Sequence, residues 1–307
     1  MSLFILGVFL VLMFLGIPVA VSLGMASLGA ILMYDTSTIA SAVKLMYSSM
    51  NSFTMVAVPL FFLAGILMDK GGVAEQIFSF CEDVVGWIHG GLGHVNIMTS
   101  ILFAGMSGSS VADVASIGAL CANAMIRSGY PSPYAWGTTL ASSMLASVIP
   151  PSILMVVAAS VAQVSMGQAL FAGIIPGVFL GLVMMVYNYF YCKKHGIGHR
   201  IPFNGGRLWK SFKRALPALM VPVILLGGMY TGYFTSTEAA AICVLYTLIV
   251  SMFVYKKLTF KDLPGIFMSV AKSTGTVLFV AITAKPAGQL FTLDGFPALV
   301  SSAITGL

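Results

Sequence analysis

Long apolar stretches with almost no charge run through this 307-residue chain, and they limit its fold more than any other feature. Charged residues make up 8% of the sequence and hydrophobic residues 59%, with a mean hydropathy of +1.00. A soluble domain carries about 25% charged residues, so this chain has too few charges to cover a water-facing surface. At roughly 20 residues per span, it holds up to about a dozen membrane segments. The composition therefore predicts an all-α, multi-pass protein whose exterior faces a lipid bilayer.

The basic residues behind the net charge of +6 lie between the apolar stretches. Seven Lys and Arg residues and no acidic residue occur within 193–214, and three lysines follow at 256, 257 and 261. Such placement sets membrane topology through the positive-inside rule. We therefore expect both basic segments in the cytoplasm and no nucleic-acid partner.

The apolar stretches predict the order of the membrane segments. The first 33 residues indicate two closely joined spans with a hinge at residues 16–18, and an amphipathic helix at the membrane interface is expected just after the span 53–68. Further apolar stretches cover 169–191, 215–232, 237–254 and 264–303.

A short polar run at 107–110 interrupts apolar sequence. The apolar pieces on either side, 97–106 and 111–126, are too short to be full spans. We therefore expect a re-entrant hairpin over about 97–126, with Ser107, Gly108, Ser109 and Ser110 at its tip. Backbone at this depth must be satisfied by protein, ions or a water-filled cavity.

Asp113 follows the tip and is the only acidic residue between Asp83 and Glu238. A lone carboxylate at membrane depth indicates a functional site. The alternative is local: Ser109 and Ser110 cap a helix, and Asp113 satisfies the amides of its first turn.

Tandem prolines interrupt the apolar stretch 134–164. Because proline removes an amide donor and clashes with the preceding turn, we expect two half-helices that meet at Ile149, Pro150, Pro151 and Ser152. Broken helices bind sodium through freed carbonyls and anions through freed amides. Ser142 and Ser143, on the first half-helix, either line the same cavity or pack against other helices.

A third polar run holds Thr235, Ser236 and Glu238, a pattern typical of a helix N-cap. Enzyme signatures such as a P-loop, H-E-x-x-H or G-x-S-x-G do not occur in the sequence. We expect no enzymatic activity and no ATP hydrolysis by this chain.

Together these segments resemble the large membrane subunit of the tripartite ATP-independent periplasmic (TRAP) transporters of the dicarboxylate and sialate type. The resemblance runs nearly end to end. It rests on residues 59–65 (PLFFLAG), 90–92 (GGL), 107–113 (SGSSVAD), 127–131 (RSGYP), 149–152 (IPPS), 171–177 (FAGIIPG) and 235–240 (TSTEAA).

The resemblance implies an inverted-repeat elevator transporter, in which each repeat has a re-entrant hairpin and a broken helix. Residues 1–52 would be N-terminal scaffold helices and 53–168 the first transport-domain repeat. Residues 169–262 would be scaffold helices with the basic loop 193–214, and 263–307 the start of a second transport-domain repeat. Because the chain stops at Leu307, that repeat would be incomplete, and we expect a C-terminally truncated, split or fragmentary gene product.

The same resemblance implies sodium-coupled uptake of small organic acids, such as C4-dicarboxylates or sialic acid, across the bacterial inner membrane. A periplasmic solute-binding protein would deliver the substrate, and a small membrane (Q) subunit would brace the scaffold. Sodium, the coupling ion, would bind at Ser107–Ser110 and Ile149–Ser152, and no organic cofactor is expected. Asp113, Ser142 and Ser143 are candidates for substrate contact.

Two other functions stay open from the sequence. One is an elevator-type anion symporter that needs no binding protein. The other is a non-transporting membrane assembly component or an inactive truncated copy. A neighbouring gene for a periplasmic binding protein would favour the binding-protein-dependent transporter over both of these alternatives. Lys285 and Pro286 depart from the small or apolar residues usual in the family.

Overall fold

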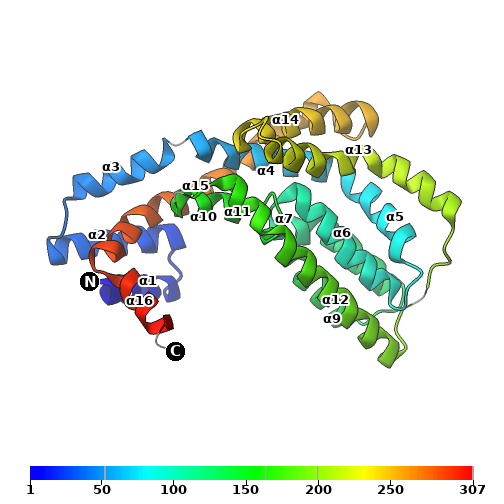
Figure 1. The fold of residues 1–307 in the computed structure, drawn as a ribbon, viewed down its shortest axis with the longest axis horizontal. Helices are drawn as coiled ribbons and strands as arrows, with labels where there is room; N and C mark the ends of the chain where they lie inside the picture. Colours follow the sequence, from blue (N-terminus) through cyan, green and yellow to red (C-terminus); the bar gives the residue numbers. More distant parts are fainter. Residues whose placement is uncertain (52, 163, 199, 306–307) are drawn as a thin grey trace. The chain divides into compact units, whose positions relative to one another are not determined.

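A computed structural model describes residues 1–51, 53–162, 164–198 and 200–305 of the chain. These described residues form α-helices with short 3-10 and π turns and contain no β-strand (Figure 1). The all-helical class predicted from composition is therefore confirmed. The chain divides into two compact units, one formed by Met1–Met55 with Lys272–Leu307 and the other by Val56–Ala271.

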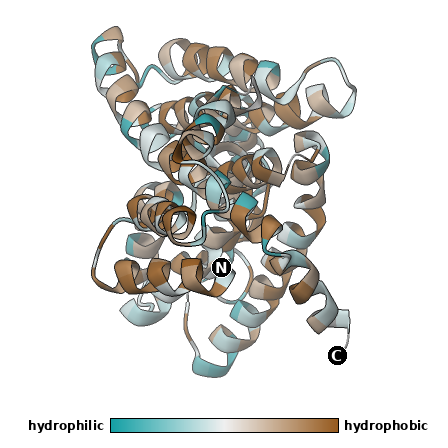
Figure 2. Ribbon diagram, turned by 90° about the vertical axis from the view of Figure 1, so that its left-hand side faces the viewer, coloured by the Kyte–Doolittle hydropathy of each residue, from teal (hydrophilic) through white to brown (hydrophobic). Residues whose placement is uncertain are grey.

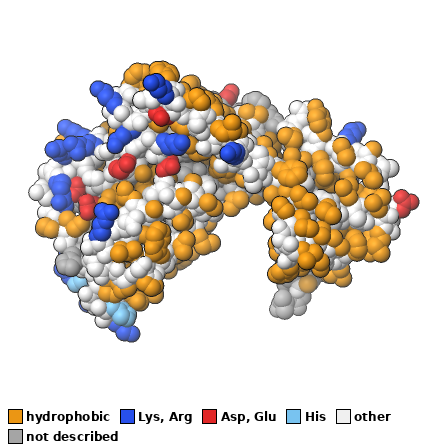
Figure 3. Space-filling view, turned by 180° about the vertical axis from the view of Figure 1, so that it is seen from behind, with side chains coloured by type: hydrophobic (Ala, Val, Ile, Leu, Met, Phe, Trp, Pro, Cys, Tyr) orange, Lys and Arg blue, Asp and Glu red, His pale blue; other side chains and the backbone are white. Residues whose placement is uncertain are grey.

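Four helical segments of the described chain are long and apolar enough to cross a membrane: Met166–His195, Gly205–Tyr230, Ser236–Val254 and Phe260–Leu293. A fifth span results if two helices that meet at a bend, α4 (Ala57–Lys70) and α5 (Val73–Val85), count as one. Hydrophobic residues recur along the helices (Figure 2), and hydrophobic side chains cover broad areas of the surface (Figure 3). The spans expected at 169–191 and 237–254 lie within these segments, and the span expected at 215–232 ends two residues earlier, at Tyr230.

The basic segment is more helical than its composition indicates. Helix α12 (Ile174–His195) ends after Lys193, Lys194 and His195, where cations complement the partial negative charge of a helix C-terminus. Helix α13 (Gly205–Tyr230) begins at Asn204, whose Oδ1 accepts from two amides of its first turn. The described residues that connect the two helices are therefore 196–198 and 200–204, a shorter connection than the predicted 193–214.

The smaller unit contains α1 (Ser2–Phe14), α2 (Val19–Tyr34), α3 (Ile39–Met50), α16 (Phe296–Thr305) and most of α15 (Leu263–Leu293). The predicted hinge is present, because Gly16 has φ +83° and Pro18 caps α2. Helices α1 and α2 have only 13 and 16 residues, so each is shorter than the full span of about 20 residues expected there. The early turn at Gly16 is the reason.

Two residues from opposite ends of the sequence meet in this unit. The amide and hydroxyl of Ser2 donate to Asp294 Oδ2 at 2.7 and 2.6 Å. These hydrogen bonds hold the pKa of Asp294 below its usual range. Ile5, Ala30 and Leu290 form part of the apolar core beside them.

In the larger unit, α4 (Ala57–Lys70) and α5 (Val73–Val85) are bent by 68° at Gly71 and Gly72. The amphipathic α5, expected at the membrane interface, packs against α6 (Gly91–Ser107) and α13. Its buried Asp83 forms an ion pair with Arg207 of α13. The polar face of α5 therefore contacts protein as well as solvent.

Helix α14 (Ser236–Ile249) follows α13 in the same unit. Thr235 Oγ1 accepts from the amide of Glu238, whose carboxylate accepts from the amide of Thr235 at 2.8 Å. This reciprocal pair confirms the predicted N-cap.

Candidate functional site

A helical hairpin occupies the segment where the sequence predicts one. Helix α6 runs to Ser107, and Gly108 ends it in the left-handed region with φ +61°. The return arm is α7 (Ser110–Asp113), a π turn at Val114–Gly118 and α8 (Ala119–Arg127). Both arms pack against each other, and the polar run 107–110 lies at the tip.

The helix expected at 134–164 is broken, as the tandem prolines predict. Helix α9 (Ser132–Ser143) ends in a 3-10 turn at Met144–Ser147, and α10 (Ile153–Ala162) begins after a non-helical stretch. Residue 163 lies outside the described residues. Among the described residues, the carbonyls of residues 148–151 accept no backbone hydrogen bond. The break therefore leaves a group of oxygen acceptors without helical donors.

The tip and the break touch each other. The amide of Ile153 donates to Gly108 O at 3.1 Å, so the tip caps the second half-helix. The hydroxyls of Ser110 and Ser147 lie 2.5 Å apart. A β-carbon on Gly108 would lie 2.0 Å from Pro151 O, so only glycine permits this approach. The hairpin tip and the helix break, which the sequence analysis predicts as parts of one site, are therefore in contact.

The predicted serines differ in what they contact. Ser109 caps the return arm by accepting from the amide of Ala112 at 3.4 Å, which agrees with the local alternative for this residue. Ser152 donates to Ser147 O at 2.7 Å and accepts from an amide of α10 at 3.3 Å. Ser107 is buried, and its Oγ has no hydrogen-bond partner among the described residues. Among the four serines predicted for the sodium site, Ser107 is therefore the one whose hydroxyl no described residue uses.

Asp113 is fully buried behind the tip. Hydroxyls of Ser100 and Ser143 lie near enough to interact with its carboxylate. Neither carboxylate oxygen has a hydrogen bond of normal geometry among the described residues, however, nor does the Ser143 hydroxyl. A carboxylate that satisfied its helix amides would show short, directed bonds. The capping role for Asp113 is absent.

Ser142 belongs to a hydrogen-bonded network next to this carboxylate. It accepts from Ser100 Oγ at 3.0 Å and donates to Asn96 Oδ1 at 3.3 Å. Asn96 Nδ2 in turn donates to Thr139 Oγ1 at 2.7 Å. Asp113, Ser142 and Ser143 are thus brought together inside the hairpin, and substrate contact by them stays a prediction.

Sequence reasoning missed the residues that α6 and α4 contribute. Asn96, Thr99 and Ser100 line one buried face of α6, and their i, i+3, i+4 spacing is the signal that finds them. Gly65 of α4 lies against the tip, because a β-carbon there would be 3.1 Å from Ser107 O. Its only sequence signal is its place at the end of the segment 59–65.

A bundle of apolar helices with an internal hairpin, a broken helix and buried polar groups at their contact defines a multi-pass membrane permease. The model of the family "Tripartite ATP-independent periplasmic transporter, DctM component" matches residues 6–307. The chain belongs to this family, and it is a protein of the bacterial inner membrane.

Several characterised proteins are similar over nearly the whole chain. The sialic acid TRAP transporter permease SiaT of Haemophilus influenzae is 36% identical over 98% of this chain and 50% of its own length. The large permease proteins SiaM of Vibrio cholerae and DctM of Pseudomonas aeruginosa are 37% and 36% identical, over 94% and 93% of this chain. The match covers 68% and 67% of those two proteins. The chain therefore spans one half to two thirds of the length of these relatives.

Proposed function

We propose that this chain takes part in sodium-coupled uptake of small organic acids. Family membership supports the transport role. The observation that carries sodium coupling is the contact between tip and break, where the carbonyls of Pro150 and Pro151, free of backbone hydrogen bonds among the described residues, lie near Gly105 and Gly108, which flank Ser107 within two residues in the sequence. Sodium is a hard cation that prefers several oxygen ligands, and broken helices supply them.

The oxygens at this contact are of two kinds. Ser107 offers a hydroxyl that no described protein group uses. The unwound segment offers carbonyls, and the tip brings its backbone within reach of Pro151 O. Ser109, Ser110 and Ser152 support the site by capping helices and by joining its two halves.

The substrate class follows from the relatives. Their names specify sialic acid, C4-dicarboxylate, isethionate and 2,3-diketo-L-gulonate. All of these are small organic anions. We extend that class to this chain without choosing among its members.

The partners follow from the same family. A periplasmic solute-binding protein delivers the substrate, and a small membrane subunit braces the scaffold. The hairpin and the broken helix move together against that scaffold as an elevator. The inward voltage assists each sodium ion by about 2.3 kcal/mol per 100 mV.

Uptake into proteoliposomes tests this function. This chain is reconstituted with a small permease subunit and a binding protein from its relatives, and uptake of labelled sialate and succinate is followed. An inward sodium gradient should drive uptake, whereas an equal potassium gradient should not. Uptake that proceeds equally without sodium or without the binding protein would refute the proposal.

A further inference from the structure

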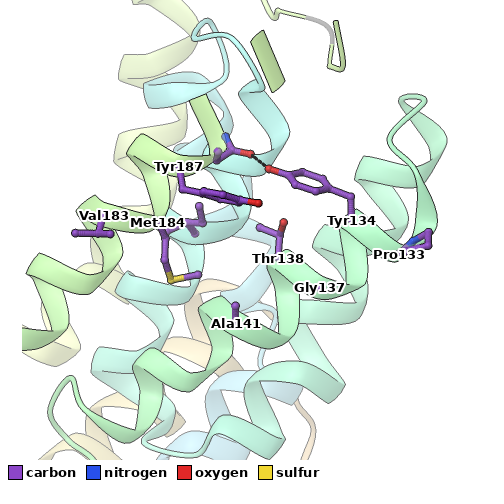
Figure 4. Close-up of a pocket in the computed structure, with 10 residues that line it drawn as sticks. Pro133, Tyr134, Gly137, Thr138, Ala141, Val183, Met184 and Tyr187 are labelled. Atoms are coloured by element: carbon purple, nitrogen blue, oxygen red, sulfur yellow. Dashed lines mark hydrogen bonds between the residues drawn. The ribbon is translucent and has the colours of Figure 1, made fainter. Parts of the chain in front are cut away.

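A cavity lies on the surface of the larger unit, between helices α9 and α12. Helices α9 and α12 both pack on α6 and leave between them a cavity of about 460 Å³ (Figure 4). Gly137 and Ala141 of α9 and Val183 and Met184 of α12 form its walls, and Ile97 of α6 forms its floor. The deep part of this groove is apolar.

One end of the groove is closed by polar and aromatic groups. Tyr134 OH donates to Asn188 Oδ1 at 2.8 Å, the bond drawn in Figure 4. The Tyr134 ring stacks on Tyr191 with centroids 4.4 Å apart. Tyr187 stands at the rim with 62% of its surface exposed. Tyrosines in this arrangement are typical of the level where lipid headgroups meet the acyl region.

Positive charge continues from the same end. Lys193, Lys194 and His195 are exposed in the last turn of α12. No acidic residue occurs in the sequence between Asp113 and Glu238. The groove therefore passes from apolar walls through an aromatic rim to a cationic end over a few helical turns.

We propose that this groove holds one anionic phospholipid from the leaflet next to the basic segment. An acyl chain lies between α9 and α12, and the phosphate lies beside Tyr187 and Lys194. A phospholipid matches the sequence of apolar, aromatic and cationic surfaces, whereas an apolar helix of a partner would leave the cationic end unmatched. Basic pockets between membrane helices on the cytoplasmic side bind such lipids. This inference goes beyond the proposed function and needs only that the chain lies in a membrane.

Native mass spectrometry of the purified full chain tests this site. The chain is titrated with phosphatidylglycerol and with phosphatidylcholine of the same acyl chains. We expect one phosphatidylglycerol to bind, roughly tenfold or more tighter than phosphatidylcholine, because the lysines attract its net negative charge, whereas the choline group of phosphatidylcholine neutralises the phosphate. Ala141→Trp fills the groove and should abolish this binding. Leu182→Trp, on the exposed outer side of α12, should leave it unchanged.

Variants that remove lysine charges distinguish selection of the lipid headgroup from binding of its acyl chain. Lys193→Gln with Lys194→Gln should remove the preference for phosphatidylglycerol while weak binding of both lipids persists. Lys256→Gln with Lys257→Gln, in the other basic segment, is the matched control and should keep the preference. Equal binding of the two lipids by the parent, or parental binding by the Ala141→Trp variant, would overturn the proposal.

Discussion

Gly108 combines a left-handed backbone with the closest contact between the tip and the break. Its φ is +61°, and a β-carbon would lie 2.0 Å from Pro151 O. A non-glycine residue in this backbone region costs about 1–3 kcal/mol, and displacement of Pro151 adds to that cost. The glycine therefore fixes how near the two halves of the site approach each other.

Replacing Gly108 with alanine tests this role. We expect Gly108→Ala to lower the free energy of unfolding by about 2 kcal/mol or more and to weaken sodium binding. Gly227→Ala is the matched control, because nothing lies within 4 Å of a β-carbon at that helical position. The control should be neutral or slightly stabilising. Similar melting temperatures for Gly108→Ala and the control would contradict the contact.

Asp113 lowers the stability of the fold through the charge of its buried carboxylate, not through backbone strain as at Gly108. A fully buried carboxylate without directed hydrogen bonds is expensive in the ionised form. Asp113→Asn keeps the shape and removes the charge. We expect this variant to melt at a higher temperature than the parent in sodium-free buffer. A lower melting temperature without sodium would show that the carboxylate is well satisfied.

At the scale of elements, one ion pair joins α5 to α13. Asp83 has 3% of its side chain exposed and Arg207 has 47%. Loss of the arginine leaves a buried charge unpaired, which is worse than loss of both partners. The pair therefore holds α5 against α13 although the chain has few charges.

A double-mutant cycle measures this link. Arg207→Ala should cost about 3 kcal/mol of unfolding free energy, and Asp83→Ala combined with Arg207→Ala should cost less than Arg207→Ala alone. Lys210→Ala, three residues further along α13, is the control for loss of a basic residue. Costs that simply add would show that the two side chains act independently.

The elements that sequence reasoning finds are those with a local cause. Adjacent prolines inside an apolar stretch predict a helix break, and a polar run with Gly108 predicts a tip. The contact between tip and break is not local, because it depends on packing between residues 37 positions apart. The roles of Gly65 and of the polar face of α6 are hidden for the same reason. The two N-terminal helices are shorter than predicted, because an uncharged stretch does not reveal where a turn ends a helix.

At the scale of the whole molecule, membrane topology is open to a direct test. The loop 196–204 and the segment from Lys256 to Lys261 are separated by two spans, α13 and α14 with its π turn. Two spans return the chain to the same side, and from the lysines and arginines of the two segments we expect that side to be the cytoplasm.

Reporter fusions check this arrangement. A reporter inserted after Gly196 and another after Lys261 should both give a cytoplasmic signal. A fusion after Gly232, in the turn between α13 and α14, should give a periplasmic signal. Opposite signals from the first two positions would show that α13 and α14 do not form a pair of spans.

The central claim is that the tip and the break together form a selective sodium site. A ligand that binds only the folded state at 100 times its dissociation constant stabilises that state by about 2.7 kcal/mol. The melting temperature of the purified chain is therefore measured in sodium and in potassium at equal ionic strength. Pro264→Ala, an exposed proline at the start of α15, is the control.

We predict that sodium raises the melting temperature of the parent and of the control, and that potassium does not. Ser107→Ala should reduce this shift, because it removes one oxygen. Pro150→Ala with Pro151→Ala should reduce it further, because a restored helix withdraws several carbonyls at once. A sodium shift in the double proline variant equal to that of the parent would place the site elsewhere, and equal shifts with sodium and potassium would show that no selective site exists.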